Sequence, residues 1–506
     1  MPKVTFFTEK GITESFCPAG IPLTEAAASA GVTIVAPCGG KGICGNCRVV
    51  VEGEVSKPSA AEISFLRGDE RKGIRLACMT YVAGDCKAAV LSAGLKAETA
   101  KSKISSSTGL NKSKHFAAVA DIGTTSVIID VYSLPECEKA AHKVFMNPQV
   151  NYGSDVVTRL DYCINGDRKI LTEIINRAID KAFESLNVNP EFVIVTGNTA
   201  MLHIAAGKDA RGLANYPFEP ETLFGEWIGD RYYMRCASAY IGGDVVASVL
   251  ASRITESRAA AVLSDIGTNN ETVLYNGTEL FACSSAAGPA FEGARISRGM
   301  PASDGAITKV KIGGDGTVLC ETVGNAKPRG FCGSGLISAV DEFYKNGYIS
   351  HAGDILATLP EFGGVVITPS DIAELQLAKS AVYSGITSLA HKAGIGLESI
   401  KKFVPAGNFG AEIDLEAAER IGMIPAGFAL IAAAPVSAAE GAAMLLKDES
   451  RIPESIRIAQ SVNTLELANY EFFADEFIGN LYFPYLDEET EIENFIKRSE
   501  RRKNGL

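Results

Sequence analysis

Four cysteines within the first eighty residues place the tightest constraint on how this chain folds. Cys38, Cys44 and Cys47 share one short segment with the spacing C-x5-C-x2-C, and Cys78 follows much further along. This spacing is one residue longer than the plant-type C-x4-C-x2-C…C pattern that holds a [2Fe–2S] cluster. Three thiols on so short a segment can face a common centre only if the backbone bends sharply, which the glycines around them allow. The same bends leave backbone N–H groups near the sulfurs, where their hydrogen bonds raise the reduction potential.

A structural zinc site is the alternative interpretation of these cysteines. Zinc motifs usually pair two close spacings, such as two C-x2-C units, or one such unit with two histidines. This chain has one such unit, a lone distant cysteine and no histidine before His115. We therefore predict a [2Fe–2S] cluster bound by Cys38, Cys44, Cys47 and Cys78. Cys17 and Cys86 lie outside the spacing and are expected to be small buried thiols.

The residues around the cysteines predict a small β-rich domain over residues 1–92. Apolar alternation predicts strands at 4–7, 13–16, 49–51 and 88–91, and a short helix at 23–30. With its cysteine spacing, this part of the chain resembles a β-grasp ferredoxin.

Composition excludes several other classes of protein. The chain has 506 residues, 46% of them hydrophobic, and a net charge of −12, which argues against a nucleic-acid partner. Twelve cysteines without a signal peptide predict a reducing, cytoplasmic setting. The longest apolar stretch, 424–446, is interrupted by two prolines and a glutamate, so we predict a buried helix near a glycine-rich loop and no membrane span.

Two segments are expected to be poorly structured. Residues 93–114 hold five lysines and many serines without an apolar period, and predict a flexible linker that tethers the ferredoxin domain loosely. Residues 487–506 are polar and charged, and predict a frayed surface helix.

A short motif occurs twice in the rest of the chain. Asp121-Ile-Gly-Thr-Thr-Ser126 returns as Asp265-Ile-Gly-Thr-Asn-Asn270, and each copy lies between two apolar strands, at 116–120 and 127–132 and at 259–263 and 272–275. Glycine in such a hairpin turn lets the backbone approach a phosphate, and N–H groups and hydroxyls of the following residues can donate to its oxygens. A carboxylate at the strand end can hold Mg²⁺ directly or through water. The duplication predicts two phosphate-binding loops.

The two loops resemble those of the acetate and sugar kinase, Hsp70 and actin superfamily, in which two related α/β lobes close over ATP. A third element, Phe403-Val-Pro-Ala-Gly-Asn-Phe-Gly410, matches the superfamily segment that contacts adenosine. The fold class expected from this resemblance is α/β: a two-lobed actin/Hsp70-like ATPase domain with duplicated RNase H-like lobes, preceded by the β-grasp ferredoxin domain. We expect lobe I at 115–257 and lobe II at 258–486.

Further segments narrow the resemblance to one family. They are Asn147-Pro-Gln-Val-Asn-Tyr-Gly-Ser-Asp155, Val195-Thr-Gly-Asn-Thr199, Ala286-Ala-Gly-Pro-Ala-Phe-Glu-Gly293, Gly330-Phe-Cys-Gly-Ser-Gly335, Leu375-Gln-Leu-Ala-Lys379 and Leu481-Tyr-Phe-Pro484. With the ferredoxin motif, they make the chain similar to reductive activators of corrinoid proteins over nearly its whole length. The resemblance implies an enzyme that uses ATP to pass one electron from its [2Fe–2S] cluster to an inactive Co(II) corrinoid, restoring Co(I). It also implies a corrinoid protein and an upstream electron donor as partners, and leaves a homodimer open.

The motifs assign two sets of residues to ATP and Mg²⁺. The predicted catalytic residues are Asp121, Asp265, Asn198, Asp244 and Glu292. The predicted nucleotide-binding residues are Gly123, Thr124, Thr125, Gly267, Thr268, Asn269, Gly288, Gly333, Ser334, Gly335, Gly407 and Asn408. Helix capping or loop hydrogen bonding is the alternative role for Asn198, Asp244 and Glu292, and an ordinary turn is the alternative for each glycine.

Two departures from the family pattern bear on these assignments. Larger members carry a middle domain between the ferredoxin and ATPase parts, where this chain has only the linker. The second loop usually continues Asn-Gly-Glu, whereas Asn270 stands here in place of glycine. Two other functions stay open: a small-molecule kinase with a regulatory iron–sulfur domain, and a non-enzymatic ferredoxin-type electron carrier.

Overall fold

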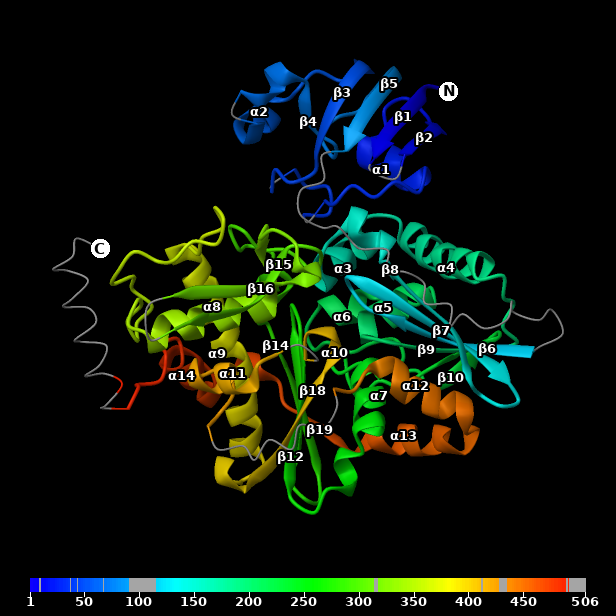
Figure 1. The fold of residues 1–506 in the computed structure, drawn as a ribbon. Helices are drawn as coiled ribbons and strands as arrows, with labels where there is room; N and C mark the ends of the chain where they lie inside the picture. Colours follow the sequence, from blue (N-terminus) through cyan, green and yellow to red (C-terminus); the bar gives the residue numbers. More distant parts are fainter. Residues whose placement is uncertain are drawn as a thin grey trace. The chain divides into compact units, whose positions relative to one another are not determined.

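The structure, a computed structural model, forms two compact units, Met1–Gly242 and Gly243–Leu506 (Figure 1). It describes residues 1–8, 11–36, 38–42, 44–66, 68–90, 115–313, 317–410, 413–426, 435–487 and 490, without the side chains of 408 and 409. The predicted linker 93–114 and nearly all of the predicted tail lie outside these residues. The second unit begins before the expected lobe boundary at 257/258, because helix α7 (Gly243–Ser252) packs against α12 (Ala438–Lys447) and α13 (Ile452–Ser461).

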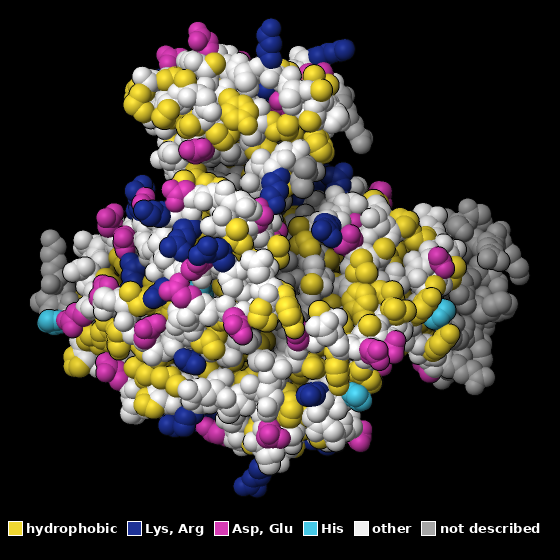
Figure 2. Space-filling model, turned by 180° about the vertical axis from the view of Figure 1, so that it is seen from behind, with side chains coloured by type: hydrophobic (Ala, Val, Ile, Leu, Met, Phe, Trp, Pro, Cys, Tyr) yellow, Lys and Arg dark blue, Asp and Glu magenta, His cyan; other side chains and the backbone are white. Residues whose placement is uncertain are grey.

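The N-terminal domain is built on a five-stranded sheet with the order β2-β1-β5-β3-β4. Its elements are β1 (Lys3–Thr8), β2 (Gly11–Phe16), α1 (Leu23–Ser29), β3 (Arg48–Val55), α2 (Ala60–Leu66), η1 (Asp69–Lys72), β4 (Ile74–Leu76) and β5 (Val82–Val90). The strands and the helix expected from apolar alternation are confirmed. Cys17 and Cys86 are both buried in the core, as predicted, and burial raises the pKa of Cys86 to about 11. The outer face of the β1–β2 hairpin exposes Phe7, Ile12 and Phe16, and hydrophobic side chains are visible on the surface of this domain in Figure 2.

The rest of the first unit is a six-stranded sheet with helices. Its order is β10-β11-β9-β6-β7-β8, with β6, β7 and β8 antiparallel and β9 parallel to β6. The elements are β6 (His115–Ile122), β7 (Ser126–Leu134), β8 (Lys139–Met146), η2 (Pro148–Tyr152), α3 (Val156–Asn165), α4 (Arg168–Ser185), β9 (Val193–Gly197), α5 (Thr199–Ala205), α6 (Arg211–Ala214), β10 (Glu226–Ile228) and β11 (Arg231–Tyr233). The apolar run before the first phosphate loop forms β6, buried nearly throughout as a central strand requires.

The second unit repeats this strand plan. In its sheet β18-β12-β13-β14-β19, the first three consecutive strands β12, β13 and β14 are antiparallel, and β18 lies parallel to β12. The sheet strands are β12 (Ala260–Ile266), β13 (Asn270–Tyr275), β14 (Leu280–Ser285), β18 (Ile400–Ala406) and β19 (Val462–Thr464). The repeated order of three antiparallel strands and one parallel strand confirms the predicted duplicated lobes.

The remaining elements of the second unit form a smaller sheet, β16-β15-β17, and a set of helices. They are η3 (Ile254–Glu256), η4 (Pro289–Glu292), β15 (Ala306–Ile312), β16 (Val318–Thr322), η5 (Val323–Asn325), β17 (Gly330–Phe331), α8 (Gly333–Lys345), α9 (Pro369–Lys392), η6 (Leu397–Ser399), α10 (Gly407–Gly410), α11 (Leu415–Arg420), η7 (Glu449–Arg451), η8 (Leu467–Asn469) and α14 (Glu471–Gly479). Helix α9 begins with a capping box between Thr368 and Asp371, and Pro369 occupies the first helical position.

The apolar stretch 424–446 contributes the helix α12, which confirms the predicted buried helix from Ala438 onward; residues 427–434 lie outside the described part. No helix in the described part of the chain is both long and apolar enough to cross a membrane.

Candidate functional site

The four predicted cluster cysteines lie as two neighbouring pairs. The Sγ atoms of Cys47 and Cys78 are 3.2 Å apart, and the Cys44 thiol interacts with Cys38. The hydrogen bond to Cys78 lowers the pKa of Cys47 to about 7. Two irons that each take two thiolates require this pairwise arrangement, so the donor set fits a [2Fe–2S] cluster. Among the described residues, no group of three or more His, Cys, Asp or Glu side chains is gathered around one point to hold a single metal ion.

Sharp turns in the cysteine loop bring these thiols together. The glycines at 39, 40, 42 and 45 all have positive φ, between 60° and 83°, where other residues are strained. Backbone groups of the loop reach the sulfurs, as expected: Asn46 hydrogen-bonds to the Cys44 thiol and Gly42 to the Cys78 thiol. Hydrogen bonds of this kind stabilise a thiolate and tune the potential of a cluster.

A buried ion pair that sequence reasoning missed positions the fourth cysteine. Glu62 is fully buried, and its carboxylate accepts hydrogen bonds from Nε and Nη2 of Arg75 at 2.8 and 2.9 Å. The same carboxylate accepts a hydrogen bond from the backbone N–H of Leu76 at 2.9 Å. The segment that leads to Cys78 is therefore fixed to helix α2. In sequence, the two residues look like ordinary surface charges, and only their shared burial reveals the role.

The first phosphate loop is held by neutral and basic side chains. Asp121 lies in β6 near its end, half-buried, and a Cβ at Gly123 would lie 2.8 Å from the carbonyl oxygen of Ser126, so this turn requires glycine. Asn198 caps helix α5 and donates from Nδ2 to the Thr124 hydroxyl at 3.1 Å. The side chain of Asn198 therefore both caps α5 and contacts the loop. The backbone carbonyl of Thr125 accepts a hydrogen bond from the backbone N–H of Asn147 at 2.9 Å.

Two fully buried side chains near this loop were not predicted from the sequence. Asn147 donates from Nδ2 to the Gly123 carbonyl at 2.8 Å, and Arg159 donates from Nη2 to the Thr124 carbonyl at 2.6 Å. Burial lowers the pKa of Arg159 to about 9. Burial of a polar side chain indicates a functional or structural role only when its hydrogen-bond partners are known. The sequence alone therefore could not identify these two residues.

The second phosphate loop is held by a carboxylate. Glu292 accepts both the backbone N–H and the hydroxyl of Thr268, at 3.0 and 2.7 Å, and the Gly288 N–H donates to the Thr268 carbonyl at 2.9 Å. A Cβ at Gly407 would lie 2.3 Å from Oδ1 of Asp265. The structure therefore brings Asp265, Thr268, Gly288, Glu292 and Gly407 together. The Asn408 side chain lies outside the described residues.

Three carboxyl groups share the surroundings of this second loop. Burial raises the pKa of Asp244 to about 7, with a further contribution from the charge of Asp265, and it raises the pKa of Asp265 to about 6, helped by Glu292. Burial also raises the pKa of Glu271 well above its ordinary range, with the charges of Asp244 and Asp265 adding to the effect. Carboxylates that repel one another in this way are stabilised by a cation or by protons. Among the described residues no three carboxylates are gathered around one point, so these groups influence one another's charge without forming a complete metal site. Glu271 was not predicted as a site residue.

Asn270, which stands in place of the family's glycine, is not in a left-handed turn. It lies in β13, paired with Ile266. Its fully buried amide accepts from Ser264 Oγ at 2.7 Å and donates to Thr272 Oγ1 at 2.8 Å. This residue therefore closes the hairpin through its side chain, and Asn269 lies in the exposed turn before it.

The glycines of the predicted nucleotide-binding turn 333–335 have a packing role. Gly333, Ser334 and Gly335 form the buried first turn of α8, and a Cβ at Gly335 would lie 1.8 Å from the carbonyl oxygen of Ile307 in β15. The close approach of α8 to β15 accounts for Gly335 without a nucleotide. Cys332 is buried and donates to the same carbonyl.

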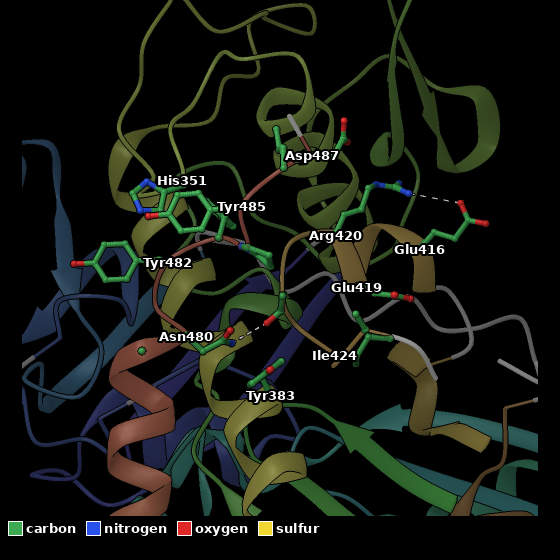
Figure 3. Close-up of a pocket in the computed structure, with 16 residues that line it drawn as sticks. His351, Tyr383, Glu416, Glu419, Arg420, Ile424, Asn480, Tyr482, Tyr485 and Asp487 are labelled. Carbon is green, nitrogen blue, oxygen red and sulfur yellow. Dashed lines mark hydrogen bonds and ion pairs between the residues drawn. The ribbon is translucent and has the colours of Figure 1, made fainter. Parts of the chain in front are cut away.

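A separate pocket of about 890 Å³ opens in the second unit, away from the predicted site residues (Figure 3). His351 stacks on Tyr482 and Tyr485 along one side, with ring centroids 5.4 and 4.7 Å apart, and Arg420 and Glu416 lie on the other. Residues 479–487, which we term the C-terminal strap, form much of its wall.

Two of the family-specific segments meet in this strap. Lys379 of α9 is fully buried and donates from Nζ to the carbonyls of Asn480 and Tyr482, the latter at 2.8 Å. Gln376 donates from Nε2 to the Leu481 carbonyl at 2.9 Å. Burial lowers the pKa of Lys379 to about 7. The segment 375–379 therefore anchors the segment 481–484 to the body of the unit.

The fold and these sites define the class of the protein: a ferredoxin domain joined to an actin- and Hsp70-like ASKHA fold. Residues 7–83 match the 2Fe-2S iron-sulfur cluster binding domain. Residues 116–257 match the RACo middle region, and residues 259–493 match the C-terminal domain of RACo, the ASKHA domain. The chain belongs to the RACo family, which confirms the resemblance found in its sequence. The middle-region match falls on the predicted lobe I.

Individual relatives agree with this assignment. The chain is 27% identical over 421 residues to the corrinoid activation enzyme RamQ of Eubacterium limosum, covering 72% of this chain and 69% of that protein. It is 26% identical over 416 residues to the [Co(II) methylated amine-specific corrinoid protein] reductase of Methanosarcina barkeri, covering 73% and 77%. A solved reductive activator for corrinoid, iron-sulfur protein aligns with a TM-score of 0.65 at 26% identity, over 97% of this chain and 99% of that one. These relatives are named as enzymes.

Proposed function

We propose that this protein is an ATP-dependent reductive activator of a methyl-transferring corrinoid protein. One electron leaves the reduced [2Fe–2S] cluster, Co(II) of the partner's corrinoid becomes Co(I), and an external electron donor reduces the cluster again. The observation that carries the proposal is the presence, in one chain, of a paired four-cysteine site and two phosphate-loop hairpins. The described cysteines form no disulfide bond, which favours a reducing compartment, the cytoplasm, as the setting.

The energetics explain why an electron carrier of this kind needs ATP. When bound, a plant-type cluster supplies electrons at a reduction potential of about −400 mV. For one electron, each 59 mV uphill costs about 1.4 kcal/mol. A more negative acceptor is therefore reached only with an energy input, which nucleotide binding and hydrolysis would provide.

The chain's own residues divide the work in this proposal. Thr124 would donate to phosphate oxygens from its turn, and Asp265 and Asp244 would hold Mg²⁺ and orient the attacking water. Phosphoryl transfer depends mainly on positioning and charge neutralisation, which such a set of groups supplies. In the ferredoxin domain, Glu62 and Arg75 hold the segment that carries the fourth thiol.

The test is the reduction of a methyl-transferring corrinoid protein purified in the Co(II) state. We expect the reduced protein with Mg-ATP to produce the Co(I) absorption spectrum, and the Cys47→Ser variant to fail because it cannot hold the cluster. Absence of Co(I) with every corrinoid partner would contradict the proposal. Full electron delivery by Asp265→Asn would favour the carrier alternative, and ADP release driven by a metabolite without a protein partner would favour the kinase alternative.

A further inference from the structure

One short segment of the first unit touches both the first phosphate loop and the ferredoxin domain. It comprises residues 147–153 with the helix η2, followed by Arg159 in α3. The sequence marks 147–155 as family-specific, but neither ATP chemistry nor cluster binding explains it.

At the phosphate-loop end, the segment is hydrogen-bonded to two consecutive carbonyls. Asn147 donates to the Gly123 carbonyl at 2.8 Å, and Arg159 donates to the Thr124 carbonyl at 2.6 Å. Each carbonyl belongs to the same planar peptide unit as the next N–H group, that of Thr124 or Thr125. A phosphate that accepts from those N–H groups polarises the peptide units and strengthens the hydrogen bonds on their other side.

At the ferredoxin end, Asn151 holds the strand-like segment that runs into the cysteine loop. Its Oδ1 accepts the N–H of Ile34 at 3.0 Å, and its Nδ2 donates to the Val32 carbonyl at 3.3 Å. All three residues are buried. A backbone held through both its donor and its acceptor has one register only, so this amide fixes how the ferredoxin domain lies on the first lobe.

The cysteine loop itself reaches the same segment. A Cβ at Gly39, the neighbour of Cys38, would lie 2.7 Å from the Tyr152 carbonyl oxygen and 2.6 Å from the Thr158 methyl carbon. Gly39 has φ of 60°, so its glycine identity serves both the turn and this approach. Arg159 also donates from Nε to the Gly153 carbonyl at 2.9 Å, next to that contact. One guanidinium thus connects the phosphate loop to the residues that face the cysteine loop.

We propose that Asn151 and Arg159 are positioning residues that couple occupancy of the first phosphate loop to the seating of the ferredoxin domain on the first lobe. Nucleotide bound at Thr124 and Thr125 tightens residues 147–153, and this segment in turn tightens the backbone at 32–39. Because coupling between two sites is reciprocal, loosening the ferredoxin domain weakens nucleotide binding by the same factor. The inference rests on the proposed function, since it requires a nucleotide at this loop.

The experiment measures hydrogen exchange in the full-length protein with and without a Mg²⁺-bound, non-hydrolysable ATP analogue. In the wild-type protein we expect the analogue to slow hydrogen exchange at 121–126. It should also slow exchange at 32–42, by about tenfold. Asn151→Leu, close in volume, should keep the protection at 121–126, lose it at 32–42 and bind the analogue about fivefold more weakly. Lys41→Ala is the matched control: it removes only the exposed ion pair to Asp161 across the same contact, and should behave as wild type.

The possible results separate this inference from the proposed function. Protection at 121–126 without any at 32–42 in the wild type, or an unchanged response in Asn151→Leu, overturns the coupling while leaving the nucleotide site intact. No protection at 121–126 in the wild type overturns the nucleotide site and the coupling with it. Arg159→Lys gives a second test: it keeps the buried charge but cannot bridge both carbonyls, so it should reduce the response at 32–42.

Discussion

The two phosphate loops share a sequence and a strand plan but differ in what holds them. The first loop has Asn147, Asn198 and Arg159 around it, whose amide and guanidinium groups donate to its carbonyls and to a hydroxyl. At the second loop, the side chain of Glu292 is instead an acceptor, for the backbone N–H and the hydroxyl of Thr268. Duplication thus preserved the turn while the surroundings took opposite charge. Within the proposed function, we therefore assign cation and water chemistry to the acidic loop, and phosphate contact and communication with the ferredoxin domain to the first loop.

The largest expected effect compares the aspartates of the two loops. Asp265→Asn should lower ATP turnover by about 100-fold, because it removes a charge that positions Mg²⁺ and water. Asp121→Asn, at the matching position of the first loop, should lower turnover by roughly tenfold. Steady-state ADP release measures both, and unchanged thermal melting serves as the control for folding. Equal losses in the two variants would break the distinction drawn between the loops.

The next effect concerns the support of the first loop. Asn147→Ala should lower the free energy of unfolding by about 1 kcal/mol, because it leaves the partly buried Gly123 carbonyl without this donor. It also removes the side-chain cap of η2. Urea denaturation measures the change. A loss below about 0.5 kcal/mol would show that the loop does not depend on this residue.

The corresponding support in the second loop is the amide of Asn270. Asn270→Ala should cost about 1 kcal/mol, since it leaves the Ser264 and Thr272 hydroxyls to find new partners within the hairpin. Asn270→Gly, which restores the usual family residue, should cost a similar amount because the side-chain network is lost. A stabilised glycine variant in the same melting experiment would contradict the closing role assigned to this amide.

The smallest expected effect is the removal of one charge beside the second loop. Glu292→Gln keeps an acceptor for Thr268, so stability should change by less than about 0.5 kcal/mol. Its charge contributes to the raised pKa of Asp265, so that pKa should fall towards its ordinary value. Mg-nucleotide affinity should weaken by about threefold, which isothermal titration can resolve. A gain in affinity would show that the charge of Glu292 repels the nucleotide, and would contradict this prediction.

The sequence was sufficient wherever the signal is local. The cysteine spacing and the two hairpins with their strands are contained in short segments, and the structure forms the strands as expected. The sequence failed where a polar residue gains its role by burial against a distant partner. Glu62 with Arg75, Arg159 with Thr124, and Asn151 with Ile34 are separated by 13, 35 and 117 residues. Periodicity cannot distinguish such side chains from charges and amides on the surface.

The C-terminal strap has a consequence for the order in which the second unit is assembled. The carbonyls that accept from the Lys379 amine lie 101 and 103 residues further along the chain. Ribosomes add about 5–20 residues per second from the N-terminus, so helix α9 is synthesised seconds before those acceptors exist. Burying an ammonium group without acceptors is costly, and this part of the core therefore stays open until the strap emerges. The pocket beside it cannot take shape before residues 479–487 are synthesised, because they form much of its wall.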